Sequence, residues 1–251
     1  MRVLVTFAVE AEFVPWRRIR NFVASSDRNC TVFTTQIGQA EVDVLLTGIG
    51  GKSAWLETTK RIWDGDVDIC VSSGLAAALR PDYRPGEILA AKRVYAPRWG
   101  RIVVCEESLL GIAIESGGRE VDSFYSADHV VISADEKREL GRTYDVVEME
   151  SGEVLHEAAG FGARVVAIRG ISDSVEEDLP LNFNRVVNVS GEVSMPRVLG
   201  EVVKHPSAVP RLIRFGQQSR MAAERLGDFL DRYIQRVATA GPRLPREVAA
   251  Q

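Results

Sequence analysis

The sequence lacks most of the features that direct a chain to a specialised class of protein. Its 31 Lys and Arg are balanced by 35 Asp and Glu, so no strong positive field indicates a nucleic-acid partner. No apolar run approaches the roughly 20 residues that span a bilayer. The apolar residues 3–9 are followed at once by Glu10 and Glu12, which predicts a first strand rather than a signal peptide. We therefore expect a cytoplasmic protein that binds no nucleic acid.

Cysteine and histidine are scarce as well. Cys30, Cys70 and Cys105 lie far apart without CxxC spacing, and two of them fall in apolar runs, which favours buried structural thiols over a nucleophile. The three histidines are scattered, and no HxH, HExxH or acidic-loop spacing occurs. We expect neither a metal nor another cofactor. No GxSxG motif is present, so a serine-triad hydrolase has no support.

The hydrophobic pattern is typical of an α/β protein. A chain of 251 residues is long enough for one sizeable core. We predict a single domain over residues 1–238, with a helical C-terminal extension from about residue 190 and a disordered tail at 239–251. Predicted strands cover residues 3–7, 31–37, 41–46, 68–72, 88–95, 101–105, 130–132, 146–149 and 165–170, and residues 117–129 are predicted to form a polar loop.

The C-terminal extension is predicted to consist of helical pieces. Three prolines are expected to break it: Pro196, Pro206 and Pro210. An apolar stripe at helical spacing predicts packing on the sheet: Leu226, Phe229, Leu230 and Ile234. A basic segment lies upstream, with Arg211, Arg214 and Arg220 around apolar residues. Such a segment can make a peripheral contact with an anionic membrane or a partner, and an ordinary solvated helix face is the alternative.

Residues 146–173, VVEMESGEVLHEAAGFGARVVAIRGISD, are predicted to form a β-α-β unit. Ser151 is a candidate helix cap, and Gly160 and Gly162 are candidate stops. Parallel strands joined by a crossover point the same way, so Glu150 and Asp173 are expected at one edge of the sheet. In open α/β sheets that edge is where ligands bind.

Polar residues follow other predicted strands too. These residues are Glu10 and Glu12, Ser73, Glu150, and Ser172 with Asp173. If the strands are parallel neighbours, the carboxylates line one crevice, which suits a neutral, hydroxyl-rich ligand better than an anion. A solvated first helical turn is the alternative for Glu10 and Glu12. The TGIGG segment at residues 47–51 predicts a tight turn, and an anion-binding turn is the weaker alternative.

Five short sequence motifs occur one after another between residues 3 and 173: FAVEAEF, TGIGG, SSGLAAAL, VVEMES and VVAIRGISD. They resemble the nucleoside phosphorylase and nucleosidase superfamily, most of all its methylthioadenosine/S-adenosylhomocysteine nucleosidase branch. The resemblance implies a three-layer α/β/α fold with a central mixed, partly barrel-like sheet. It also implies a homo-oligomer that cleaves the N-glycosidic bond of a purine nucleoside, a 5′-substituted adenosine, with water or phosphate as co-substrate.

The resemblance implies a role for each matching residue. Glu150 is expected to hold the ribose hydroxyls, with Met149 packed on the sugar. Asp173 is expected to protonate the purine at N7, with Ser172 orienting it, and Glu12 to position or activate the attacking water. Further candidate substrate-binding residues are Glu148, Ser73, Gly74 and Val130.

The sequence departs from the family pattern at two positions. Leu75 replaces the serine of the family's TGSAGGL motif, and Ser72 stands where phosphorylase members carry an arginine. Without that guanidinium, phosphate loses a bidentate partner, which favours hydrolysis over phosphorolysis. Lys52 or an arginine from a neighbouring subunit is the alternative phosphate ligand.

The C-terminal segment resembles a second branch of the same superfamily. PRVLGEVVKHPSAVPRLIRF resembles the hopanoid-associated phosphorylase-like branch, which implies a lipid-linked adenosine as substrate. Two other classes of function are alternatives to an enzyme. One is a nucleoside-binding protein that has lost catalysis, and the other is a membrane-associated scaffold.

Overall fold

The computed structural model describes residues 1–27, 30–63, 66–185, 200–201, 204 and 206–240. The first half contains β1 (Arg2–Phe7), α1 (Glu10–Ile19), β2 (Val23–Asp27), β3 (Cys30–Ile37), β4 (Ala40–Leu46), α2 (Gly51–Ile62), β5 (Ile69–Ser72), β6 (Leu75–Ala78), β7 (Ile88–Ala96) and β8 (Arg101–Val104). The second half contains α3 (Glu107–Glu115), β9 (Arg119–Ser126), α4 (Ala134–Leu140), β10 (Val146–Glu148), α5 (Ser151–Gly160), β11 (Arg164–Asp173) and α7 (Val209–Ala240).

The strands form one mixed sheet in the order β2-β3-β4-β1-β5-β11-β6-β10-β9-β7-β8. β11 joins two parts of it. Residues Arg164–Ala167 pair in parallel with β5, and Gly170–Asp173 pair in parallel with β6. β11 also pairs antiparallel with β7, which closes β11, β6, β10, β9 and β7 into a ring. The predicted partly barrel-like sheet is confirmed.

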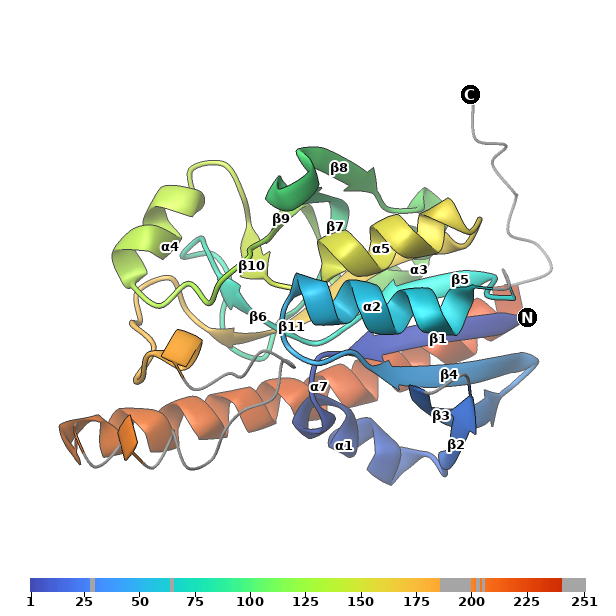
Figure 1. Ribbon diagram of the computed structural model, residues 1–251, viewed down its shortest axis with the longest axis horizontal. Helices are drawn as coiled ribbons and strands as arrows, with labels where there is room; N and C mark the ends of the chain where they lie inside the picture. Colours follow the sequence, from blue (N-terminus) through green and yellow to red (C-terminus); the bar gives the residue numbers. More distant parts are fainter. Residues whose placement is uncertain (28–29, 64–65, 186–199, 202–203, 205, 241–251) are drawn as a thin grey trace.

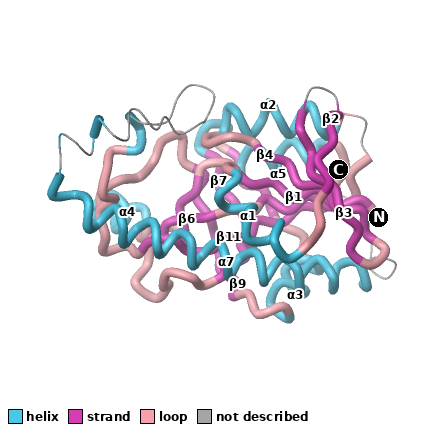
Figure 2. Tube along the Cα trace, turned by 90° about the horizontal axis from the view of Figure 1, so that it is seen from below, coloured by secondary structure: helices cyan, strands magenta, loops and turns pink. Residues whose placement is uncertain are grey.

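Helices cover both faces of this sheet (Figure 1). α2 packs on α5 on one face, and α1 packs on α7 on the other. Seen from below, α7 runs along the length of the molecule beside α1 (Figure 2). The three-layer α/β/α prediction is therefore confirmed. The core contains two buried thiols, Cys70 and Cys105, and burial raises the pKa of each to about 12.

The C-terminal helix is longer than expected. Its predicted apolar stripe is buried, as Leu226 and Leu230 are 0% exposed and Phe229 is 1% exposed. The predicted break at Pro210 is wrong, because α7 begins at Val209 and Pro210 occupies its first turn, where a missing N–H costs no intrahelical bond. Pro196 and residues 241–251 lie outside the described ranges. None of the described helices is both long and apolar enough to cross a membrane.

Two predictions between residues 117 and 132 are wrong. β9 (Arg119–Ser126) is a strand where a polar loop was expected. It pairs in parallel with β7 and β10, and its outward-facing polar residues hid the alternation of its buried residues. Residues 130–132 form no strand, because β9 pairs with the edge of β10 that such a strand would use.

The predicted parallel pairing within residues 146–173 is also wrong. β6 lies between β10 and β11, antiparallel to the first and parallel to the second. Glu150, not Ser151, is the N-cap of α5. The expected convergence nevertheless occurs, because the carboxyl end of β10 meets the start of β6, which follows directly on β5 and pairs with the end of β11.

Candidate functional site

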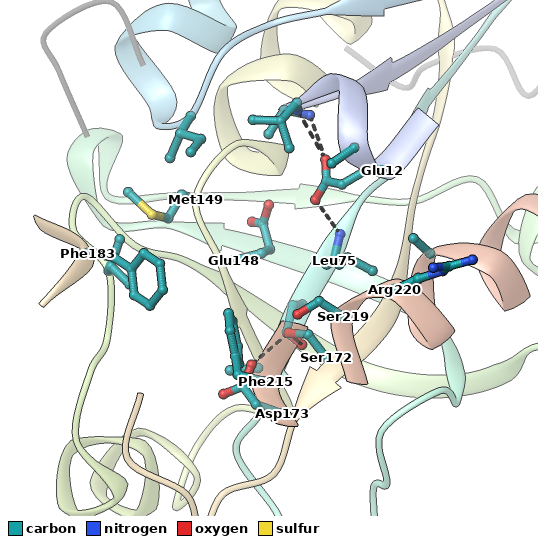
Figure 3. Close-up of a pocket in the computed structure, with 18 of the residues that line it drawn as sticks. Glu12, Leu75, Glu148, Met149, Ser172, Asp173, Phe183, Phe215, Ser219 and Arg220 are labelled. Carbon is teal, nitrogen blue, oxygen red and sulfur yellow. Dashed lines mark hydrogen bonds between the residues drawn. The ribbon is translucent and has the colours of Figure 1, made fainter. Parts of the chain in front are cut away.

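A cavity of about 630 Å³ opens where these strand ends meet, between α1, α7 and the segment before α4 (Figure 3). This volume is within the range of small-molecule sites. The cavity brings together most of the predicted site residues: Glu12, Val130, Glu148, Met149, Glu150, Ser172 and Asp173. Ser73 and Gly74 are not among the residues that line it.

Glu12 is held by backbone N–H groups at the start of α1. Its Oε2 atom accepts hydrogen bonds from Ala8 at 3.0 Å and Val9 at 3.3 Å, and its Oε1 atom accepts one from Leu75 at 2.9 Å. Burial raises the pKa of Glu12, although these N–H donors and Arg169 favour the ionised form. The carboxyl group is therefore fixed in direction, with its charge supported by the backbone.

Gly74 lies against the Glu12 carboxylate, and neither Gly74 nor Ser73 is among the residues that line the cavity. A Cβ atom on Gly74 would lie 3.2 Å from both Glu12 oxygens, and its φ of 140° favours glycine. Ser73 is 3% exposed, and its N–H donates to Thr6 at 3.0 Å. The substrate contact expected of Ser73 and Gly74 stays a prediction, and the missing side chain of Gly74 leaves room for the Glu12 carboxylate.

Glu150 is oriented by the glycine-rich turn before α2. The Gly50 N–H donates to Glu150 Oε1 at 2.8 Å, so this turn binds a carboxylate of the chain itself. Burial, and then the nearby Glu148 charge, raise the pKa of Glu150 to about 8. Met149 stands beside the turn, with its Cε atom 3.8 Å from where a Gly50 Cβ would lie.

Sequence reasoning missed Arg169, which neutralises part of this acidic cluster. Arg169 is 1% exposed, and its Nη2 atom donates to Glu148 Oε2 at 2.6 Å and Ser151 Oγ at 2.8 Å. Glu148 also accepts the N–H groups of Glu150 and Ser151 at 3.0 and 2.8 Å. Glu148 is thus fixed by its neighbours and shapes the turn that carries Glu150. An arginine within the apolar run VVAIRGI was the available signal.

Asp173 has partners at both carboxylate oxygens. Ser172 Oγ donates to Asp173 Oδ1 at 2.6 Å, and the ammonium group of Lys137 forms an ion pair with Oδ2. Burial raises the pKa of Asp173, while Lys137 and then Ser172 oppose that rise. Lys137 was also missed, since it lies in the polar segment ADEKREL.

The rest of the cavity is mainly apolar. Its walls extend past Leu75 to residues of α1 and α7 and to Phe183: Val14, Pro15, Phe183, Phe215 and Ala223. Figure 3 shows Phe183 and Phe215 near the Met149 and Asp173 sides, with Arg220 farther along α7. Acidic groups beside extensive apolar walls suit a ligand with a polar part and a hydrophobic substituent.

Comparisons with known proteins identify the fold. Residues 120–198 match the family model described as Phosphorylase superfamily. The futalosine hydrolase of Helicobacter pylori superposes with a TM-score of 0.72 at 18% identity, covering 94% of this chain and 98% of that chain.

Two nucleosidases have the same fold. The 5′-methylthioadenosine/S-adenosylhomocysteine nucleosidase of Neisseria meningitidis, in complex with methylthio-immucillin-A, gives a TM-score of 0.72 at 18% identity over 94% of this chain and 99% of that chain. The Campylobacter jejuni nucleosidase gives 0.70 at 15% identity with the same coverage of 94% and 99%. Residues 120–198 thus resemble the phosphorylase superfamily, and the chain has the fold of these nucleosidases.

Proposed function

We propose that this chain cleaves the N-glycosidic bond of a purine nucleoside and releases the free base. The observation that carries the proposal is the convergence of Glu12, Glu150 and Asp173 on one cavity from three separate parts of the chain. Breaking this bond leaves positive charge on the ribosyl carbon and negative charge on the base. The reaction therefore needs an acid at the base and anionic groups at the sugar.

Each acid has a proposed role that fits its surroundings. Glu150, fixed by Gly50, binds the ribose hydroxyls, and Met149 packs on the sugar. Glu12, whose carboxyl group is fixed by three backbone N–H donors, positions and activates water. Asp173, oriented by Ser172, donates a proton to N7 of the base. Val130 contributes an apolar wall.

We favour water over phosphate as the second substrate. The buried Arg169 is already engaged by Glu148 and Ser151. The arginines that line the cavity, Arg18 and Arg220, come from its α1 and α7 walls. Phosphate therefore has no buried guanidinium free to bind it among these lining residues, and bidentate Arg contacts are the usual means of holding it.

We propose a 5′-substituted adenosine as the substrate, because apolar walls adjoin the acidic groups of the cavity. A lipid-linked nucleoside is the second candidate. It is favoured by Leu75, which replaces a serine of the family motif, and by the aromatic walls at Phe183 and Phe215. A homo-oligomer, a cytoplasmic location and a peripheral membrane contact stay predictions.

One assay tests these proposals together. The purified protein is incubated with adenosine, 5′-methylthioadenosine and a long-chain 5′-alkyl adenosine, with and without phosphate, and the products are identified by chromatography and mass spectrometry. We expect adenine and free sugar without phosphate. A strict phosphate requirement would contradict hydrolysis, and faster cleavage of the long-chain compound would favour the lipid-linked substrate. Binding of adenosine derivatives without any cleavage would indicate a binding protein instead of an enzyme.

A further inference from the structure

The ammonium group of Lys137 is enclosed behind Asp173. Lys137 is 0% exposed and is not among the residues that line the cavity. Besides its ion pair with Asp173, its Nζ atom donates to the carbonyl oxygens of Ser174 at 3.1 Å and Glu177 at 2.8 Å. An ammonium group has three N–H donors, so these three acceptors use all of them. This geometry fixes the cation in one place.

The two segments on either side of Lys137 are also joined to each other by hydrogen bonds. The turn after β11 is bound to the segment before α4 by the Leu179 N–H, which donates to Ile132 at 2.9 Å. The Ala134 N–H donates to Asp178 Oδ1 at 2.7 Å. Lys137 lies between these segments and holds the end of β11, from which Asp173 projects. Its contacts therefore determine where the carboxyl group of Asp173 lies.

On the basis of the function proposed above, we propose that Lys137 is a positioning residue for the reaction. Its ammonium group holds the Asp173 carboxyl group at the cavity and controls whether that group carries a proton. A carboxylic acid that must donate a proton needs to be neutral when the substrate is bound, whereas a neighbouring cation favours its ionised form. Lys137 therefore makes Asp173 a stronger acid than burial alone would allow.

Other charged groups also lie near Asp173. A second cavity of about 290 Å³ adjoins Asp173, and its charged lining residues are Glu176, Glu177, Asp178, Arg211 and Arg214. Glu177 opposes the ionisation of Asp173, but it pairs with Arg214 at 2.5 Å. Glu176 pairs with Arg138 at 3.0 Å. Lys137 is thus the cation in direct contact with the Asp173 carboxylate.

The test compares the pH dependence of kcat for wild type, Lys137→Met and Lys137→Arg, using the adenosine derivative that wild type cleaves fastest. We expect the wild-type rate to fall at high pH as Asp173 loses its proton. In Lys137→Met the plateau should be about 10- to 100-fold lower, a smaller loss than the roughly 10²–10⁴-fold that acid catalysis supplies in full, because Asp173 is still present but less well positioned. The fall should also move to higher pH, because the lost cation no longer favours ionisation. Lys137→Arg should keep the wild-type position of the fall.

A matched control separates this role from simple loss of a buried ion pair. Arg61 is 2% exposed and pairs with the buried Asp43 away from the cavity. Arg61→Met should lower stability as Lys137→Met does, but it should leave the pH dependence of kcat unchanged. A Lys137→Met profile with the wild-type position of the fall would overturn the inference, while base release by wild type would still support the proposed function.

A second readout does not depend on turnover. Adenine binding by wild type should weaken as pH rises, because a protonated Asp173 donates to N7, and this weakening should move to higher pH in Lys137→Met. Calorimetric titration measures both. Identical pH dependence of adenine binding in the two proteins would overturn the inference. If wild type neither cleaved an adenosine derivative nor bound adenine, the proposed function and this inference would both fail.

Discussion

At the scale of single residues, the site consists of acids whose partners hold them in fixed directions. Glu12 has three backbone N–H donors, Glu150 has one, and Asp173 has a serine hydroxyl and a lysine. Preorganised groups of this kind need little rearrangement when charge develops in the transition state. The direction that its partners impose is therefore part of what each acid contributes to the site.

Asp173→Asn tests the acid directly. The amide keeps the shape but has no proton to donate, so kcat should fall by about 10²–10⁴-fold. The structure adds a cost to stability, because Lys137 would stay buried without its anion. Breaking a buried pair costs on the order of 3–5 kcal/mol. Urea denaturation should show this loss.

The double variant is the control for that cost. Lys137→Met combined with Asp173→Asn removes both charges and should be more stable than Asp173→Asn alone, because no unpaired ion remains. Equal stability of the single and double variants would contradict a coupled pair. Wild-type turnover in Asp173→Asn would remove Asp173 from the mechanism.

At the scale of elements, the wall of the cavity that α1 and α7 form depends on how closely the two helices approach each other. A Cβ atom on Gly227 would lie 2.9 Å from the backbone nitrogen of Trp16 and 3.3 Å from the carbonyl carbon of Pro15. Both neighbours are backbone atoms that no side-chain rotation can move away. The spacing of the two helices is thus set by the absence of a side chain at position 227.

Gly227→Ala should push the two helices apart. Overpacking of this kind costs about 1–3 kcal/mol, and we expect a loss of that size in urea denaturation. KM should change most for substrates with long 5′-substituents, because α1 and α7 form that wall. Gly216→Ala on the same helix is the stability control. Nothing lies within 4 Å of its added Cβ, so it should gain about 0.5–1 kcal/mol. A Gly227→Ala variant as stable as Gly216→Ala would refute the close-packing argument.

The sequence predicted elements and acids better than it predicted their partners. Glu12, Glu150 and Asp173 follow apolar strands, so their common edge was visible from local pattern. Lys137 and Asp173 are 36 residues apart, and the segment ADEKREL shows no apolar face that would identify Lys137 as buried. β9 was missed for a similar reason, because which face of a polar strand is buried depends on its neighbours in the barrel.

At the scale of the whole molecule, the site concentrates acidic side chains in buried positions. Glu12, Glu148 and Glu150 lie close to one guanidinium, that of Arg169. The raised pKa of Glu150, about 8, means that the folded state binds a proton more tightly than the unfolded chain. Stability from this group is present below the unfolded pKa near 4.5 and is lost as pH rises through 8.

Glu150→Gln should therefore stabilise the protein at alkaline pH. The gain over wild type should be small at pH 5 and larger at pH 9, with an upper limit of about 5 kcal/mol, since each pKa unit is worth about 1.4 kcal/mol. Thermal unfolding at both pH values measures it. Glu139→Gln, at an exposed pair with Arg142, is the control and should show no such trend. A gain that is the same at both pH values would mean that charge burial is not its cause.

β11 connects the candidate site to the rest of the sheet. β11 bonds to β5, β6 and β7 along its length, and it carries both Arg169 and Asp173. Asp173 and the arginine that fixes Glu148 therefore lie on the strand that joins the open wing of the sheet to its closed ring. Substitutions that shift this strand would disturb architecture and reactivity together, whereas the distant β2–β3 ribbon is free to diverge without reaching the reaction centre.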